Sequence, residues 1–140
     1  MAHHEYEWLP SSLVSSPDVS AINDLLKPDE RITIWGVRAM ISEMSFLLVA
    51  REQGRMLSMG RLLIVTTPAE KVGRIIDCVV AENVPNREEI GKKLIDDLVA
   101  RAQAKPPVDR IEFVPSRDDV MNQICLSLGL DMAKECQAIS

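Results

Sequence analysis

The feature that most constrains this chain is an apolar segment that runs through a polar turn into an amphipathic segment, over residues 75–94. Residues 75–80 are rich in β-branched side chains and almost continuously apolar, which is typical of a strand covered on both faces. After the turn, apolar residues recur at helical spacing from Ile90 to Ala102, with charged residues between them. A strand that leads into a helix places free backbone N–H groups and the positive end of the helix dipole together. Phosphate groups commonly bind at such a point.

The rest of the chain divides into segments with strand or helix patterns. Strands are expected over residues 5–9, 45–51, 55–67, 73–81, 108–114 and 132–139. Helices are expected over residues 17–27, 31–43, 87–104 and 117–128. Gly60 marks a bend in the longest strand, and Gly129 the end of the last helix. The order β-α-α-β-β-β-α-β-α-β predicts a mixed α/β domain whose central mixed sheet carries helices on both faces.

Polar residues before three of the helical segments predict how those helices begin. Ser16 is the expected cap of the first helix, and Ser116, with Asp119 three residues further on, is the expected cap of the last. Asn86 is the expected cap of the central helix, where Glu89 completes a capping-box arrangement.

Composition and charge exclude several classes of protein. At 140 residues the chain fits one domain, residues 1–140, and its net charge of −5 argues against a general nucleic-acid or anionic-membrane binder. It has neither a long apolar run nor a basic-then-apolar start, so no membrane span or secretory signal is predicted. Cys78, Cys125 and Cys136 are odd in number and widely spaced, which indicates reduced thiols in a cytoplasmic protein. No metal site is expected, because the adjacent His3 and His4 lie at a chain end.

Two segments of this sequence match known motifs in part. The strand ending Cys-Val-Val at residues 78–80 is followed by Ile-Gly-Lys-Lys-Leu at residues 90–94, and Pro-Ser-Arg at 115–117 is followed by Leu-Ser-Leu-Gly-Leu at 126–130. Together they resemble the GNAT superfamily, the acyl-CoA-dependent N-acetyltransferases. That family has a Val-Val-Val strand followed by Arg/Gln-x-x-Gly-x-Gly/Ala, and then Pro-Ser-Arg with Tyr-x-x-Leu-Gly-Phe. The order of elements also fits, from about residue 5 to the end.

The resemblance implies acetyl-CoA as co-substrate, bound where the fourth and fifth strands part. By resemblance, the backbone of Cys78, Val79 and Val80 would pair with the pantetheine arm. The pyrophosphate would lie on the loop and first helical turn, at Asn86, Arg87, Glu88, Glu89, Ile90, Gly91 and Lys92. This chain departs from the family because its turn is one residue longer, the family's Arg/Gln position falls on Asn86, and its first Gly falls on Glu89.

The same residues also have a purely structural interpretation. Residues 86–89 form a well-made helix start, in which Glu88 and Glu89 already supply the negative charge that a phosphate would bring. Each glutamate beside a pyrophosphate would repel it by roughly 1 kcal/mol at about 4 Å in water. Arg87, Lys92 and Lys93 could offset this repulsion.

Acetyl transfer to an amine needs a base for the amine proton, and often an acid for the departing thiolate. In related sequences a Glu often precedes the Asp of the fourth strand, and here that position is Ile76. Asp77 and Glu82 are the carboxylates near the strand exit, although Asp77 also fits a satisfied buried polar group and Glu82 a solvated loop residue. The family's usual tyrosine acid falls on Cys125, whose neighbours favour a core position, and the only tyrosine is Tyr6.

The resemblance therefore implies transfer of an acetyl group from acetyl-CoA to a primary amine of a small molecule or peptide, by direct attack on the thioester. The alternative is a non-catalytic GNAT-fold protein, used for binding or assembly after losing its loop glycines, tyrosine and carboxylate. A nucleotide-binding module of another fold is disfavoured, because the sequence has no Gly-rich P-loop or dinucleotide fingerprint. A homodimer formed through strand edges or helices fits so small a domain.

Overall fold

The computed structural model describes residues 5–10, 14–26, 31–39, 41, 44–53, 55–104 and 107–133. Its elements are β1 (Glu5–Trp8), α1 (Ser16–Leu25), α2 (Ile34–Ala39), β2 (Ser45–Glu52), β3 (Arg55–Thr66), β4 (Lys71–Val80), α3 (Arg87–Ala102), β5 (Arg110–Phe113), α4 (Asp119–Ser127) and β6 (Asp131–Met132). The predicted order of strands and helices and the mixed α/β class are confirmed.

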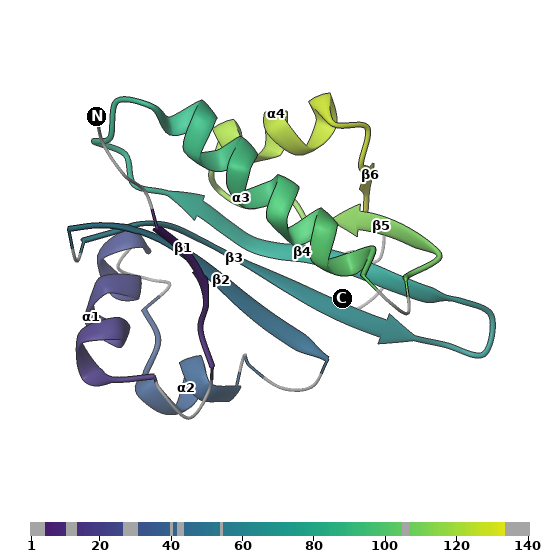
Figure 1. Ribbon diagram of the computed structural model, residues 1–140, viewed down its shortest axis with the longest axis horizontal. Helices are drawn as coiled ribbons and strands as arrows, with labels where there is room; N and C mark the ends of the chain where they lie inside the picture. Colours follow the sequence, from purple (N-terminus) through teal and green to yellow (C-terminus); the bar gives the residue numbers. More distant parts are fainter. Residues whose placement is uncertain are drawn as a thin grey trace.

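The strands form one mixed sheet in the order β1-β2-β3-β4-β5-β6. The pairs β1–β2, β2–β3 and β3–β4 are antiparallel, whereas the pairs β4–β5 and β5–β6 are parallel. Helices α3 and α4 lie on one face of the sheet, and α1 and α2 lie on the other (Figure 1). Strand β4 pairs with β3 and β5, so its predicted central place is confirmed. No helix within the described ranges is long and apolar enough to cross a membrane.

Each face of the sheet carries its own apolar core. Under α3, the buried side chains that recur at helical spacing are Ile90, Leu94, Ile95, Leu98 and Ala102. They pack with residues of β3, β4, β5 and α4. On the opposite face, Ile22 of α1 and Val37 of α2 pack against Leu47, Val49 and Met59. Burial of both faces explains why residues 75–80 of β4 are apolar except for Asp77.

A bulge bends the sheet where β3 and β4 pair. Met59 pairs with Val79 and Arg61 with Ile76, so Gly60 lies opposite two residues of β4, Asp77 and Cys78. The predicted bend at Gly60 is therefore confirmed. A side chain on Gly60 would begin 2.9 Å from Leu98 and 3.0 Å from the Cys78 sulfur. Glycine thus lets α3 pack closely over the bend.

The first two helices begin at other residues than predicted. The cap of α1 is Ser15, not Ser16, and its hydroxyl and amide form a capping box with Asp18. Helix α2 begins at Ile34 and not at residue 31, because the Asn23 side chain binds both the N–H and the C=O of Ile32, at 2.8 and 2.9 Å. Residues 40 and 42–43 of this predicted helix lie outside the described residues.

The last helix is also capped by a different residue than predicted. Its cap is Asp118, whose carboxylate accepts from the N–H of Val120 at 3.1 Å and of Met121 at 3.3 Å, and not Ser116. Gly129 ends the helix as predicted, with a φ of 78°. Strand β6 covers Asp131–Met132, and residues 134–139 of the predicted final strand lie outside the described residues.

We expect Leu98→Ala to lower the free energy of unfolding by about 2–5 kcal/mol, because it leaves a cavity between α3 and the bend of the sheet. Leu98 is 0% exposed and Leu126 is 46% exposed, so Leu126→Ala is a matched control that should change stability by under about 1 kcal/mol. Urea unfolding followed by circular dichroism measures both. Equal effects would show that α3 does not pack on the sheet in this way.

Candidate functional site

Strands β4 and β5 part at the middle of the sheet, as predicted. Their ladder ends at Ile75 and Phe113, after which the N–H of Val114 donates to the Ile75 carbonyl at 2.9 Å. Further along, the connection between β5 and α4 reaches β4 through side chains. The Ser116 hydroxyl donates to the Cys78 carbonyl at 3.0 Å, and the Asp118 carboxylate accepts from the Val80 N–H at 2.9 Å. Two polar groups on the parted edge of β4 are therefore bound by side chains of the same chain.

A groove of about 1880 Å³ follows β4 to its end. Its walls come from α1, β3, β4, the loop after β4, and the connection from β5 to α4. The predicted site residues that line it are Asp77, Cys78, Val79, Val80, Glu82 and Arg87. The structure thus brings together the predicted pantetheine strand and both candidate bases.

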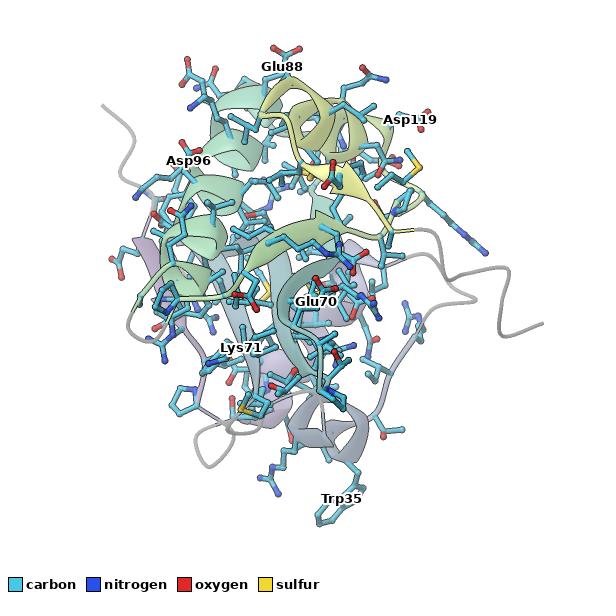
Figure 2. The ribbon with its side chains drawn as sticks, turned by 90° about the vertical axis from the view of Figure 1, so that its right-hand side faces the viewer. Trp35, Glu70, Lys71, Glu88, Asp96 and Asp119 are labelled. Atoms are coloured by element: carbon cyan, nitrogen blue, oxygen red, sulfur yellow. The ribbon has the colours of Figure 1, made fainter. Side chains whose placement is uncertain are left out.

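A smaller hollow of about 440 Å³ lies at the N-terminus of α3. Its lining residues are Val84, Pro85, Asn86, Arg87, Glu88, Glu89 and Val120. Figure 2 shows Glu88 and Asp119 at the same end of the molecule, where α3 and α4 begin. The capping box predicted for Asn86 is wrong, because no hydrogen bond joins its side chain to the described first turn of α3. The backbone N–H groups of that turn therefore make no hydrogen bond to the Asn86 side chain.

Arg87 lies between the groove and the hollow and lines both. Its guanidinium donates to the carbonyls of Ala81 at 3.1 Å and Val80 at 3.2 Å, and to the Asp118 carboxylate at 3.1 Å. The Asp118 side chain is only 5% exposed, so this ion pair is largely withdrawn from solvent. Arg87 thus connects the first turn of α3 to the end of β4 and to the cap of α4.

The two candidate bases reach the groove in different ways. Asp77 lies in the bulge with a left-handed backbone, φ 56°, a conformation that non-glycine residues seldom adopt and that occurs often at functional sites. Its side chain is 43% exposed and lies 3.2 Å from the Nε of Arg61, so the interpretation of Asp77 as a buried polar group is wrong. Glu82 is exposed in the loop after β4, which fits the solvated loop residue of the sequence interpretation.

The candidate proton donor Cys125 does not line the groove, and neither does the only tyrosine, Tyr6. Cys125 belongs to the core shared by α3, α4 and the sheet, and burial raises the pKa of its thiol to about 12. The Tyr6 hydroxyl donates to the Ile90 carbonyl at 3.3 Å, and burial, followed by the charge of Asp97, raises its pKa to about 12. The core position predicted for Cys125 is confirmed.

Three further residues of the predicted pyrophosphate segment face elsewhere. Ile90 is buried in the core, and Lys92 pairs with Asp96 one turn along the helix at 2.9 Å. Gly91 faces α4, where an added side chain would begin 2.7 Å from Ile124 and 2.8 Å from the Met121 sulfur. The space that Gly91 leaves is therefore occupied by the side chains of α4.

Sequence reasoning missed Ser116 and Asp118 as groups that reach β4, and Arg61 as the partner of Asp77. One signal was present for Asp118, because aspartate is as strong an N-cap residue as serine and precedes the apolar spacing of α4 directly. No local pattern marks the bond between Asp118 and Val80, which are separated by 38 residues.

Comparison with known proteins gives a fold but no sequence relative. No protein-family model and no curated protein matches the sequence. Several solved structures match at low identity. A predicted acetyltransferase from Clostridium acetobutylicum, solved with acetyl-CoA, is 16% identical, with a TM-score of 0.68 over 95% of this chain and 93% of that one. An acetyltransferase from Trypanosoma brucei is 22% identical, with a TM-score of 0.69 over 94% and 95% of the two chains.

The chain has the GNAT fold. A transcriptional regulator from Bacillus halodurans is similar too, at 13% identity and a TM-score of 0.71 over 95% of this chain and 96% of that one. The GNAT fold is thus matched here by structures described both as acetyltransferases and as a regulator. The fold by itself therefore does not assign an activity to this chain.

We expect Asp118→Ala to lower the free energy of unfolding by about 2–4 kcal/mol, because it removes the α4 cap and leaves Arg87 without its partner. Asp119→Ala, at the exposed next residue, is the control and should cost under about 1 kcal/mol. Chemical denaturation of the two variants measures the difference. A result in which Asp118→Ala is as stable as its control would contradict this role.

Proposed function

We propose that this protein is an N-acetyltransferase, which moves an acetyl group from acetyl-CoA to a primary amine. The observation that carries the proposal is the groove along the parted edge of β4, which leads to the N-terminus of α3 in a chain with the GNAT fold. An extended chain with amide groups can pair with such a strand edge. The pantetheine arm of acetyl-CoA has this chemistry.

The hollow at the start of α3 suits the pyrophosphate of the same molecule. Backbone N–H groups at a helix N-terminus attract anions, and Asn86 does not cap this helix with its side chain. Glu88 and Glu89 oppose this attraction, and both are exposed beside the hollow. Lys92 and Lys93 pair with Asp96 and Asp97, so among the cations that could offset the glutamates Arg87 is the one that lines the hollow.

The chemistry needs only a base and an open approach to the thioester. The amine nitrogen gives up a proton, attacks the thioester carbonyl carbon and forms the amide as the carbon–sulfur bond breaks. The departing thiolate takes up a proton from water, because neither Cys125 nor Tyr6 lines the groove. Asp77 and Glu82 line the groove and can accept the amine proton directly or through water. We propose no covalent intermediate, because burial raises the pKa of Cys78 and Cys125 and keeps both thiols protonated.

The acceptor enters, in this proposal, on the side of the groove lined by α1. Ser20 and Asp24 of α1 line this groove together with Asp77 of β4. A carboxylate in this position attracts a protonated amine before it loses its proton. The groove is open enough for either a small-molecule or a peptide amine, and we propose that the protein acts in the cytoplasm.

A non-catalytic role is the second candidate. Ser116 and Asp118 already bind the backbone of β4, and one similar structure is described as a transcriptional regulator. Calorimetric titration with acetyl-CoA separates the two candidates. Binding at micromolar to submillimolar concentration supports the enzyme, and no heat at millimolar acetyl-CoA supports the binding or assembly protein.

We expect the double change Glu88→Gln, Glu89→Gln to tighten acetyl-CoA binding by about five- to tenfold at low salt, because it removes two screened charges beside the hollow. The double change Glu5→Gln, Asp131→Asn alters the net charge equally at two exposed residues that line neither the groove nor the hollow, and it is the control. Its affinity should stay within about twofold of the wild type. If both double variants bind alike in titration calorimetry, the glutamates do not face the pyrophosphate.

We expect Asp77→Asn or Glu82→Gln, whichever removes the base, to lower kcat by about 10²–10⁴-fold. Release of the CoA thiol in the presence of amino sugars, polyamines or lysine peptides measures the rate. Asp24→Asn, in the part of the groove lined by α1, is the control and should raise KM with little change in kcat. If both variants keep full kcat, neither Asp77 nor Glu82 is the base.

A further inference from the structure

Arg87 and Val120 are the two residues that line both the groove along β4 and the hollow at the start of α3. They form the partition between the two spaces. A ligand that occupies both at once has to pass this partition. Val120 is fixed in the first turn of α4, whereas Arg87 crosses the gap with a long flexible side chain.

The two members of the ion pair are held very differently. Asp118 accepts from backbone N–H groups of β4 and α4, at Val80, Val120 and Met121, so it stays satisfied without Arg87. Arg87 is held only through its guanidinium, by Asp118 and by the carbonyls of Val80 and Ala81. The Arg87 side chain is 27% exposed to solvent. Arg87 is therefore the movable member and Asp118 the fixed one.

If Arg87 moved toward the hollow, its guanidinium would exchange carboxylate and carbonyl oxygens of the protein for phosphate oxygens of the ligand. A pyrophosphate in the hollow offers oxygens that a guanidinium binds in two-point geometry. At the same time the carbonyls of Val80 and Ala81 become free at the end of β4. These are acceptors for the amide N–H groups of an extended arm in the groove.

We propose that Arg87 is a gate for acyl-CoA, held shut by Asp118, which opens by exchanging the Asp118 carboxylate for the cofactor's pyrophosphate. The gate rests on the proposed function, because acyl-CoA is its ligand. It makes Asp118 a determinant of cofactor affinity, although Asp118 itself need not touch the cofactor. The buried pair thus competes with the cofactor for Arg87.

If Arg87 is such a gate, substitutions of Asp118 and of Arg87 change the affinity for CoA in different ways. Asp118→Asn keeps a side chain that caps α4 and leaves Arg87 free for the pyrophosphate. We expect it to tighten CoA binding by about three- to tenfold, the factor that corresponds to the net free energy of about one hydrogen bond. Arg87→Gln removes the gate and the phosphate partner together, so we expect it to bind CoA no tighter than the wild type. An ion pair with only a structural role would give both variants the same effect.

The chain supplies a matched control in a second buried ion pair. Arg74 and Glu112 are also 3.1 Å apart, with side chains 26% and 6% exposed, against 27% and 5% for Arg87 and Asp118. Neither Arg74 nor Glu112 lines the groove or the hollow. Glu112→Gln therefore reproduces the loss of charge and of stability at a distance from the site. Its affinity for CoA should stay within about twofold of the wild type.

The measurement is calorimetric titration of CoA, which binds without turnover, into the wild type and the three variants after circular dichroism has shown that each is folded. Asp118→Ser, which also keeps a capping side chain and lacks the charge, replaces Asp118→Asn should that variant unfold, and we expect it to tighten CoA binding in the same way. Tighter binding by Asp118→Asn alone supports the gate, and so does binding that appears only in Asp118→Asn.

If the wild type binds and Asp118→Asn binds no tighter, the gate is wrong and the proposed function stands. If Arg87→Gln tightens equally, Arg87 only blocks the groove and the exchange is wrong. If no variant binds millimolar CoA, the proposed function fails, and the gate fails with it.

Discussion

The carboxylate of Asp118 is the interaction on which the site end of this molecule depends. It accepts from the end of β4, caps α4 and pairs with the first residue of α3, and its side chain is 5% exposed. Hydrogen bonds and opposite charges compensate a buried carboxylate for the loss of water, and here they come from three elements. One side chain thereby fixes how both helices begin relative to the sheet.

The need for such a group follows from the parting of the strands. Once β5 leaves β4, the backbone N–H and C=O groups at the end of β4 lose their ladder partners, and buried groups of this kind must find others. Ser116 and Asp118 supply them for Cys78 and Val80. The same edge is the one that an extended ligand would pair with. The hydrogen bonds that stabilise the unliganded protein at this edge therefore occupy groups that a ligand would need. Arg87 makes three of these bonds, to Val80, Ala81 and Asp118.

Sequence patterns predicted the elements of the fold better than their ends. The 3.6-residue spacing of α3 and the β-branched run of β4 reflect burial on known faces, and both elements appear where expected. The predicted caps Ser16 and Ser116 were wrong, because neighbouring polar residues compete for one cap. Asn86 does stand at the cap position of α3, but the predicted capping box is wrong because its side chain makes no capping hydrogen bond. In α4 the choice falls on Asp118, since its carboxylate also satisfies a strand that is distant in sequence.

The sequence by itself determined the order of elements, the bend at Gly60 and the core place of Cys125, because these depend on periodicity and composition within short windows. Only the tertiary structure decided what the candidate site residues face. The bulge exposes Asp77 because two residues of β4 lie opposite one residue of β3, and α4 fills the space beside Gly91. The pairing of Arg87 with Asp118 spans 31 residues and depends on where two helices and a parted strand meet. Contacts of this range arise from strand register and helix packing, which no local pattern encodes.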